Sequence, residues 1–230
     1  MKKIALILIF ILPVVFLYAQ DITTNWPYIY SNFTQGKVYY SGGETHEAPM
    51  NIHLLKSKLH YVDGNNIKEA QNVDILLVEI GKDKYYSYNG QMIKVLSGNQ
   101  NSFLGELNLA DFSKLDDTGG AYGTSANSQS TKQLSSVEIG RYGNYGSINT
   151  NHIDMLNNKD GGKLLHVSKE YYIVADGKIY PATKKGIETE LVSDDKEAFN
   201  AFVKQNKIKW KDADSLAKLL GFLRGNNISN

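Results

Sequence analysis

The 230-residue sequence contains no cysteine, and this absence removes several classes of protein at once. Disulfides, thiol nucleophiles and thiolate ligands for zinc are all excluded. A lipid anchor attached to a cysteine behind an export signal is excluded for the same reason. The chain must therefore derive its stability from an ordinary hydrophobic core, for which about 200 residues suffice.

The sequence also lacks an excess of charge of either sign. It has 25 lysine and arginine residues against 24 aspartate and glutamate residues, and its formal net charge is +1. No dense basic stretch interrupts this balance, and binding to nucleic acid depends on such a concentration of positive charge. We therefore expect no nucleic-acid partner.

Long apolar runs are scarce, and the clearest one lies at the start of the chain. Two lysines (Lys2, Lys3) precede the run Ile4–Leu17, and the small residue Ala19 follows. A basic start, an apolar stretch and a small residue in this order are typical of a secretory signal peptide. A membrane anchor is the alternative, but the run is shorter than the roughly 20 residues that a spanning helix needs, and Pro13 interrupts it.

Cleavage near Ala19 would place the mature chain outside the cytoplasm. We expect it in the periplasm, on the cell surface or in the medium, and not spanning the membrane, since no later stretch is apolar enough to do so. The predicted domains are then a signal peptide over 1–19, a β-rich domain over 20–182 and a helical segment over 183–225.

The β-rich domain is predicted from hairpin signals. Runs rich in aromatic and β-branched residues alternate with turn dipeptides, and Asn-Gly or Asp-Gly supplies the positive φ angles of a tight turn. In the segment 84–95, a turn at Asn89-Gly90 would place Tyr86 opposite Ile93. The segment 170–182 repeats this pattern around Asp176-Gly177, and the apolar run 74–80 predicts a central strand.

Residues 113–158 differ from the rest because they are poor in large aliphatic side chains. They include Gly119-Gly120 and the polar run 124–131. Such a stretch cannot bury enough apolar surface to offset the entropy of ordering, so we expect a long flexible loop. A lid over a site is the alternative, since long loops in compact domains are often functional.

Beyond residue 182 the apolar spacing changes from that of strands to that of helices. A short helix is predicted over 183–192, a second from an N-terminal signal at Asp194, and a third from Asp212 to a C-cap at Gly225. We expect the last two to pack on each other or on the sheet rather than on a partner. The apolar stripe of the last helix consists of Leu216, Leu219, Leu220 and Leu223.

These features together predict an α+β protein. Its body is expected to be a mostly antiparallel β-sheet built from hairpins, and a C-terminal pair of helices is expected to pack on the same domain. The sequence similarity between the hairpins predicted at 84–95 and 170–182 is too short to indicate a repeat.

Motifs for catalysis are missing as well. The sequence has no Gly-x-Ser-x-Gly elbow for a serine nucleophile and no glycine-rich phosphate loop. The adjacent acids Asp116-Asp117 lie in the polar loop, where nothing suggests the desolvation that general acid–base catalysis needs. The pair Asp194-Asp195 is better explained by helix capping. We therefore predict no catalytic residue.

The five histidines give no metal-binding pattern. His53 and His60 are seven positions apart, which would place them on opposite faces of a single straight strand. Neither a His-x-x-x-His pair nor an acid-rich loop accompanies them. We interpret the histidines as scattered surface and half-buried residues, and we expect no metal and no cofactor.

Tyrosine, in contrast, is abundant, with fifteen residues and adjacent pairs at 39–40, 85–86 and 171–172. Neighbouring strand residues face opposite ways, so each pair sends one ring to each face of the sheet. Strand propensity alone explains this composition. The alternative is an aromatic surface that binds a glycan or another protein, and its candidate residues are Tyr86, Tyr88 and Tyr172.

Two blocks of sequence carry a resemblance to a known family. The first runs from Phe33-Thr-Gln-Gly-Lys-Val-Tyr-Tyr40 to Val78-Glu-Ile-Gly81, and the second combines 202–208 with 214–220. With the Tyr-Ala-Gln sequence at 18–20, they resemble a family of uncharacterised exported proteins common in Bacteroidetes-type bacteria. The resemblance implies a periplasmic, surface or secreted setting and supplies no catalytic residues.

Two functional hypotheses follow. The favoured one is an exported, non-enzymatic protein that binds another envelope protein or a glycan, because an export signal is present and catalytic motifs are missing. The alternative is a hydrolase-type enzyme whose site is assembled from distant residues near the 113–158 loop.

Overall fold

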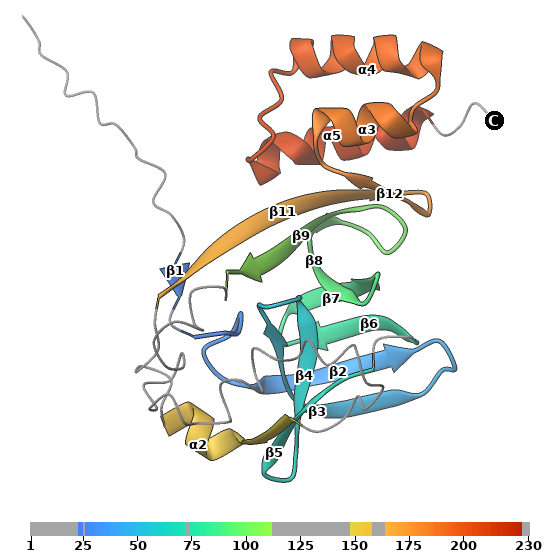
Figure 1. Ribbon diagram of the computed structural model, residues 1–230. Coiled ribbons are helices and arrows are strands. Elements are labelled where there is room, and N and C mark those ends of the chain that lie inside the picture. Colours follow the sequence, from blue (N-terminus) through green and yellow to red (C-terminus); the bar gives the residue numbers. More distant parts are fainter. Residues whose placement is uncertain (1–22, 25, 72–73, 112–147, 158–163, 227–230) are drawn as a thin grey trace, which may run out of the picture.

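The computed structural model describes residues 23–24, 26–71, 74–111, 148–157 and 164–226. Within these ranges twelve strands form one antiparallel sheet, and three of the four helices gather at the C-terminal end of the chain (Figure 1). The prediction of an α+β protein with a mostly antiparallel sheet is therefore confirmed.

The strands are β1 (Thr23–Thr24), β2 (Thr34–Tyr40), β3 (Thr45–His53), β4 (Lys58–Asp63), β5 (Asn66–Glu69), β6 (Ile75–Ile80), β7 (Asp83–Tyr88), β8 (Gln91–Gly98), β9 (Phe103–Ala110), β10 (Ile148–Asn151), β11 (Leu165–Ala175) and β12 (Lys178–Pro181). The helices are α2 (His152–Asn157), α3 (Lys184–Glu190), α4 (Ser193–Gln205) and α5 (Ala213–Asn226). None of the helices in the described ranges is long and apolar enough to cross a membrane.

The strand order is β1-β11-β9-β8-β7-β6-β2-β3-β4-β5-β10, and β12 also pairs with β11. Most neighbours are consecutive in the sequence, as expected for a sheet of hairpins. The main exception is β11, which returns from far along the chain to pair with β9. Because β6 pairs with both β2 and β7, the prediction of a central strand in this segment is confirmed.

Both predicted Asx-Gly hairpins are present. Asn89 and Gly90 have φ angles of 48° and 71°, and Asp176 and Gly177 have φ angles of 48° and 82°. Positive φ at both central residues is the requirement of the type I′ turn, whose twist matches that of the flanking strands. This turn sets the register, so Tyr86 lies opposite Ile93 as the sequence predicts.

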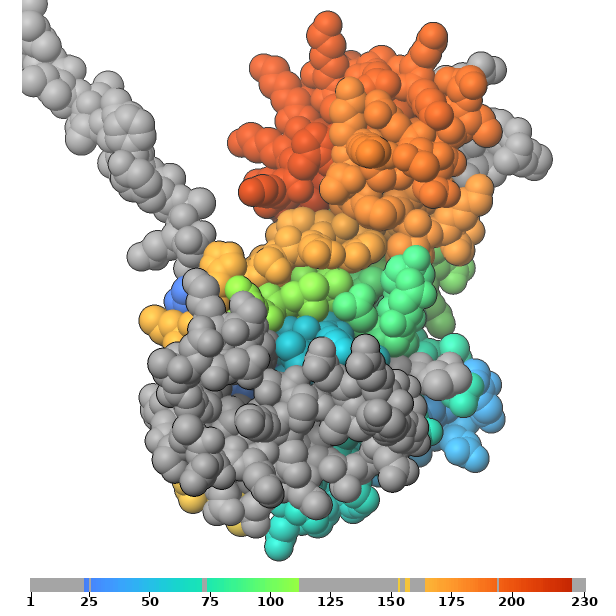
Figure 2. All heavy atoms as spheres, viewed as in Figure 1, coloured from blue at the N-terminus to red at the C-terminus, as the bar shows by residue number. Residues whose placement is uncertain are grey.

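The buried hydrophobic residues form four clusters, and the two largest lie on different parts of this sheet. One is enclosed by the curled strands β2 to β8 and contains buried residues such as Met50, Leu59 and Tyr85. The other lies between β9, β11 and β12 and the C-terminal helices, where Leu104 and Ile173 meet the helical side chains. Figure 2 shows these helices, in orange and red, as a cap that stands on strand β11.

The C-terminal segment has three helices in place of the predicted pair, because the short helix predicted over 183–192 is present as α3. The Thr183 hydroxyl accepts the Gly186 N–H at 3.0 Å and caps α3. The Asp212 carboxylate accepts the Ser215 N–H at 2.7 Å at the start of α5. The four leucines of the predicted apolar stripe are all buried in the helical core.

Two helix ends differ from the prediction. Helix α4 begins at Ser193 behind Val192, which offers no side-chain cap, so Asp194 lies inside the helix and is not its N-cap. Helix α5 continues to Asn226, so Gly225 does not terminate it. Both differences are of one or two residues, which is the extent to which helix ends ordinarily vary.

Most of the predicted flexible loop, 113–158, lies outside the described residues. Its last part does not match the prediction, because 148–151 form β10 and 152–157 form α2. Strand β10 pairs with β5, with Ile148 opposite Ile67. The edge of β5 offers unpaired backbone groups that favour such an addition, and sequence composition carries no signal for this long-range pairing.

Truncation of the helical core tests the role of the C-terminal helices. Leu216 is fully buried between α5 and the sheet, so Leu216→Ala should lower the free energy of unfolding by about 2–5 kcal/mol. Urea unfolding followed by circular dichroism measures this loss. Lys218→Ala, an exposed position on the same helix, should change stability by less than about 0.5 kcal/mol. Equal effects of the two variants would show that α5 does not pack as described.

Candidate functional site

The three tyrosines predicted as candidates meet on one face of the sheet. Tyr86 and Tyr88 lie two residues apart on β7 and therefore face the same way. Tyr172 lies on β11, and its ring centroid is 6.3 Å from that of Tyr88. Strands β8 and β9 separate β7 from β11, which in a flat sheet corresponds to about 14 Å. The sheet is therefore curved here, and the rings lean toward each other across it.

This curvature produces a cleft of about 440 Å³, which we call the aromatic cleft. Tyr86 and Tyr88 line it, and Tyr172 lies beside it against Tyr88. Successive side chains of β11 point to opposite faces of the sheet. Tyr171 therefore packs toward the helices, and Tyr172 packs toward the cleft. The adjacent pair Tyr85-Tyr86 divides in the same way between the enclosed core and the cleft.

The floor of the aromatic cleft is apolar. The Phe103 ring stacks on Tyr86 with centroids 4.9 Å apart and an interplanar angle of 21°. Ile93 and Val174 are buried beside them. Gly105 makes this packing possible, because a Cβ atom there would lie 2.3 Å from the Ile93 Cγ2 atom. The sequence indicated the tyrosines, but not Phe103 or Gly105, since no local pattern marks them.

The rim of the cleft is polar and comes from two loops. Gln100 and Asn101 lie on one, and Asp176 lies on the type I′ turn between β11 and β12. Ser102 joins them, because its Oγ accepts the Asp176 N–H at 3.3 Å and it is itself buried. Its own N–H donates to the Asn99 Oδ1 at 3.0 Å. Hydrogen bonds through the buried Ser102 thus connect the two loops that form the rim.

The phenol groups of Tyr86 and Tyr172 resist ionisation. Burial, reinforced by the nearby Glu170 carboxylate, raises the pKa of Tyr172 to about 12, and its hydroxyl donates to Glu170 at 3.1 Å. Burial also raises the pKa of Tyr86. The lining of the cleft contains a single carboxylate, that of Asp176.

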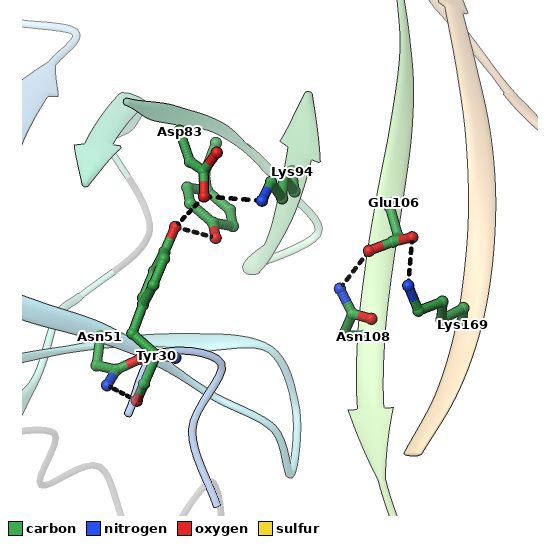
Figure 3. Close-up of polar contacts among 8 residues, drawn as sticks. Tyr30, Asn51, Asp83, Lys94, Glu106, Asn108 and Lys169 are labelled. Carbon is green, nitrogen blue, oxygen red and sulfur yellow. Dashed lines mark hydrogen bonds and ion pairs between the residues drawn. The ribbon is translucent and has the colours of Figure 1, made fainter. Parts of the chain in front are cut away.

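A second polar group lies on the inner side of the sheet (Figure 3). The Tyr30 hydroxyl donates to Asp83 at 2.7 Å and lies 2.6 Å from the Tyr85 hydroxyl. The Lys94 ammonium also donates to Asp83, at 2.7 Å. The Asn51 side chain accepts the Tyr30 N–H and donates to the Tyr30 carbonyl. This group attaches the segment before β2 to strands β3, β7 and β8.

The titration of this group does not favour acid–base catalysis. Burial by itself would raise the pKa of Asp83, but the hydrogen bonds from Lys94 and Tyr30 outweigh it and the pKa is lowered. Burial, followed by the contact with Tyr85, raises the pKa of Tyr30 far above its ordinary value. A general acid or base works best with a pKa near the operating pH, so this group is better suited to a structural role.

Glu106 forms a similar structural contact nearby. It is buried, and its carboxylate accepts hydrogen bonds from Asn108 at 2.9 Å and Lys169 at 3.1 Å (Figure 3). Because Lys169 lies on β11 and Glu106 on β9, the ion pair links the same two strands as the backbone ladder. Burying a carboxylate is costly unless it is paired, so the bonds from Asn108 and Lys169 make this position of Glu106 tolerable.

The interpretation of the histidines as surface and half-buried residues is wrong for His53 and His60, which are both buried. Their rings stack with centroids 4.8 Å apart. The chain reverses between them, so they lie on neighbouring strands, and His60 lies opposite Asn51, two residues before His53. The argument from odd spacing assumed one straight strand, and the turn between β3 and β4 removes that assumption.

The two histidines lie in a buried group that joins three strands to the start of the chain. The Tyr28 hydroxyl is 2.9 Å from the His60 Nδ1, and the Glu69 carboxylate is 3.4 Å from the His60 Nε2. Burial lowers the pKa of both histidines, and the proximity of His60 adds to the effect at His53. Among the described residues, no group of three or more His, Asp or Glu side chains is arranged to hold a metal ion.

The remaining candidate positions are not brought into any site. The acid pair Asp116-Asp117 lies outside the described residues, as do most of the residues on which the hydrolase alternative depends. Comparison with known proteins adds no candidate: no protein-family model matches the chain, and no curated protein or solved structure matches it. The resemblance to exported proteins of Bacteroidetes-type bacteria therefore stays a prediction.

The buried histidines predict acid sensitivity. In the unfolded chain both bind protons below a pH of about 6.5, whereas in the folded protein their lowered pKa values keep them neutral. The unfolded state thus binds more protons, and stability should fall as the pH falls below about 6.5, with a limiting slope of about 1.4 kcal/mol per pH unit for each histidine.

Urea unfolding between pH 6.5 and 5 measures this slope. His53→Gln should reduce the slope of stability against pH by up to about 1.4 kcal/mol per pH unit. His166→Gln, at an exposed position, should leave the slope unchanged. A stability that does not depend on pH in this window would contradict the assignment.

The hydroxyl of Tyr30 is the second target for a stability measurement. Tyr30→Phe removes the hydrogen bond to Asp83 and leaves a half-buried carboxylate with one donor fewer. The expected loss in the free energy of unfolding is about 1–2 kcal/mol. Tyr39→Phe removes a similar bond to Glu79 at the surface and should cost clearly less. A loss for Tyr30→Phe no larger than that for Tyr39→Phe would show that the inner group adds no stability.

Proposed function

We propose that this chain is an exported, non-enzymatic protein that binds a glycan through the aromatic cleft. The observation that carries the proposal is the combination of half-buried aromatic side chains with a polar rim in one hollow. Tyr86 and Tyr88 supply the aromatic side chains, and Gln100, Asn101 and Asp176 supply the rim.

The chemistry of a sugar ring fits this combination. One face of a pyranose carries C–H bonds with partial positive charge, and the electron-rich face of an aromatic ring attracts them. The edge of the same sugar carries hydroxyl groups, each of which both donates and accepts hydrogen bonds. The amides of Gln100 and Asn101 offer donors and acceptors together, and the carboxylate of Asp176 offers acceptors.

The size and shape of the cleft favour a small ligand over a protein. Its volume of about 440 Å³ lies in the lower half of the usual range for small-molecule sites. A stable protein–protein contact typically buries about 800 Å² on each partner, and a hollow of this size does not by itself offer such an area. Another envelope protein therefore stays the alternative partner.

The predicted export supports the same reading. The signal-peptide pattern over 1–19 would deliver the chain to the envelope or the medium, where glycans are abundant. The resemblance to exported proteins of Bacteroidetes-type bacteria agrees with this setting. A binding protein needs no catalytic motif, which is consistent with their absence from the sequence.

Removal of one aromatic ring tests the proposal. A glycan array first identifies which oligosaccharides bind the purified protein, and isothermal titration calorimetry then gives their affinities. Tyr88→Ala should weaken binding about ten-fold, since a stacked ring at a binding site contributes about 1.4 kcal/mol or more.

Tyr61→Ala provides a matched control. Tyr61 is also half-buried, but it lies on β4 beside His46 and does not line the cleft. Its substitution should leave the affinity unchanged. The proposal fails if no oligosaccharide binds, or if the two variants weaken binding equally.

A further inference from the structure

The charge of the aromatic cleft comes from one side chain. Asp176 is the single formally charged residue among those that line it, and no lysine, arginine or histidine is among them. Within the described residues no ion pair includes Asp176. The nearest cation in the sequence, Lys178, follows the turn on β12 but does not line the cleft. The one formal charge among the lining residues is therefore negative.

The Asp176 carboxylate is held at the rim by its surroundings. The residue occupies the first central position of a type I′ turn with φ 48°. Its N–H donates to the Ser102 Oγ at 3.3 Å, and the Ser102 hydroxyl lies 3.4 Å from its Oδ1. Ser102 is buried, so the turn is anchored to the loop that carries Gln100 and Asn101. The backbone of Asp176 is thus fixed at the rim, and the Ser102 hydroxyl gives its exposed carboxylate a preferred position there.

Two further features favour a positively charged ligand group. The faces of aromatic rings attract cations, and the aromatic residues Tyr86 and Tyr88 line the cleft. Beside the cleft, Glu170 accepts a hydrogen bond from the Tyr172 hydroxyl, which adds a second carboxylate near the rings. An acidic sugar would meet repulsion from both carboxylates and would find no basic partner in the lining.

We propose that Asp176 selects the ligand by charge, so that the cleft prefers glycans with a free amino group, such as glucosamine units, over neutral and acidic ones. This inference rests on the proposed function, because it names the class of sugar that the same cleft takes. Asp176 would pair with the ammonium at the rim while the sugar face stacks on the tyrosines.

The expected preference is modest. A carboxylate that stays in contact with water contributes little to the binding of a cation, so the amino sugar should bind about three- to five-fold more tightly than its neutral counterpart. Salt screens such a contact. Raising the salt concentration from 0.05 M to 0.5 M should therefore bring the ratio of the two affinities close to one.

A matched series of four tetrasaccharides tests the inference on the purified protein. β-1,4-linked tetramers of glucose, N-acetylglucosamine and glucosamine differ only at carbon 2, and a β-1,4-linked tetramer of glucuronic acid supplies the acidic member. Calorimetry should rank the glucosamine tetramer first and the glucuronic acid tetramer last. In Asp176→Asn the ratio between the affinities for the glucosamine and glucose tetramers should fall to about one.

The asparagine variant suits the fold, because Asn-Gly forms the same turn type at Asn89-Gly90. Asp63→Asn is the control: Asp63 also precedes a glycine, but it lies at the turn between β4 and β5, and the ratio should keep its wild-type value there. A wild-type ratio near one, a ratio retained in Asp176→Asn, or a loss of all binding in that variant would overturn the charge selection. Failure of every tetramer to bind the wild-type protein would instead contradict the proposed function.

Discussion

The antiparallel pairing of β11 with β9 is the constraint on which the rest of the structure depends. It joins segments far apart in the sequence, from Val167 opposite Ala110 to Val174 opposite Phe103. Successive residues of β11 point to opposite faces, so Ile173 lies under the helices while Val174 lies in the aromatic cleft. A single strand therefore positions both the C-terminal helical cap and one side of the candidate site.

The aromatic cleft depends on the curvature of the sheet as much as on its tyrosines. Register shifts in β8 between Val95 and Ser97 bend the sheet where it passes from the enclosed core to the helical core. Gly105 lets the Ile93 and Phe103 side chains approach closely at this bend. Strand propensity explains why tyrosines are frequent in this sheet, but it does not explain why they cluster. The bend brings Tyr88 and Tyr172 from non-adjacent strands into contact.

The buried polar groups show how the start of the chain is attached. Tyr28 reaches His60, and Tyr30 reaches Asp83 and Tyr85, so two hydroxyls from one short segment bond to groups inside the sheet. Buried polar groups are costly unless they are paired, and this pairing specifies one position for the segment. The shifted pKa values of Tyr30, His60 and Asp83 follow from burial and from these contacts.

Local sequence by itself determined the hairpins, their turns and the buried face of α5. Asn89-Gly90 and Asp176-Gly177 fix their turns through positive φ angles, and the spacing of Leu216, Leu219, Leu220 and Leu223 defines a helical face. Only the tertiary structure decided that His53 stacks on His60, that β10 joins β5, and that the tyrosines of β7 and β11 share a cleft. The physical reason is the same in each case: turn and helix signals act within a few residues, whereas these contacts depend on how the sheet curves and which distant strands pair.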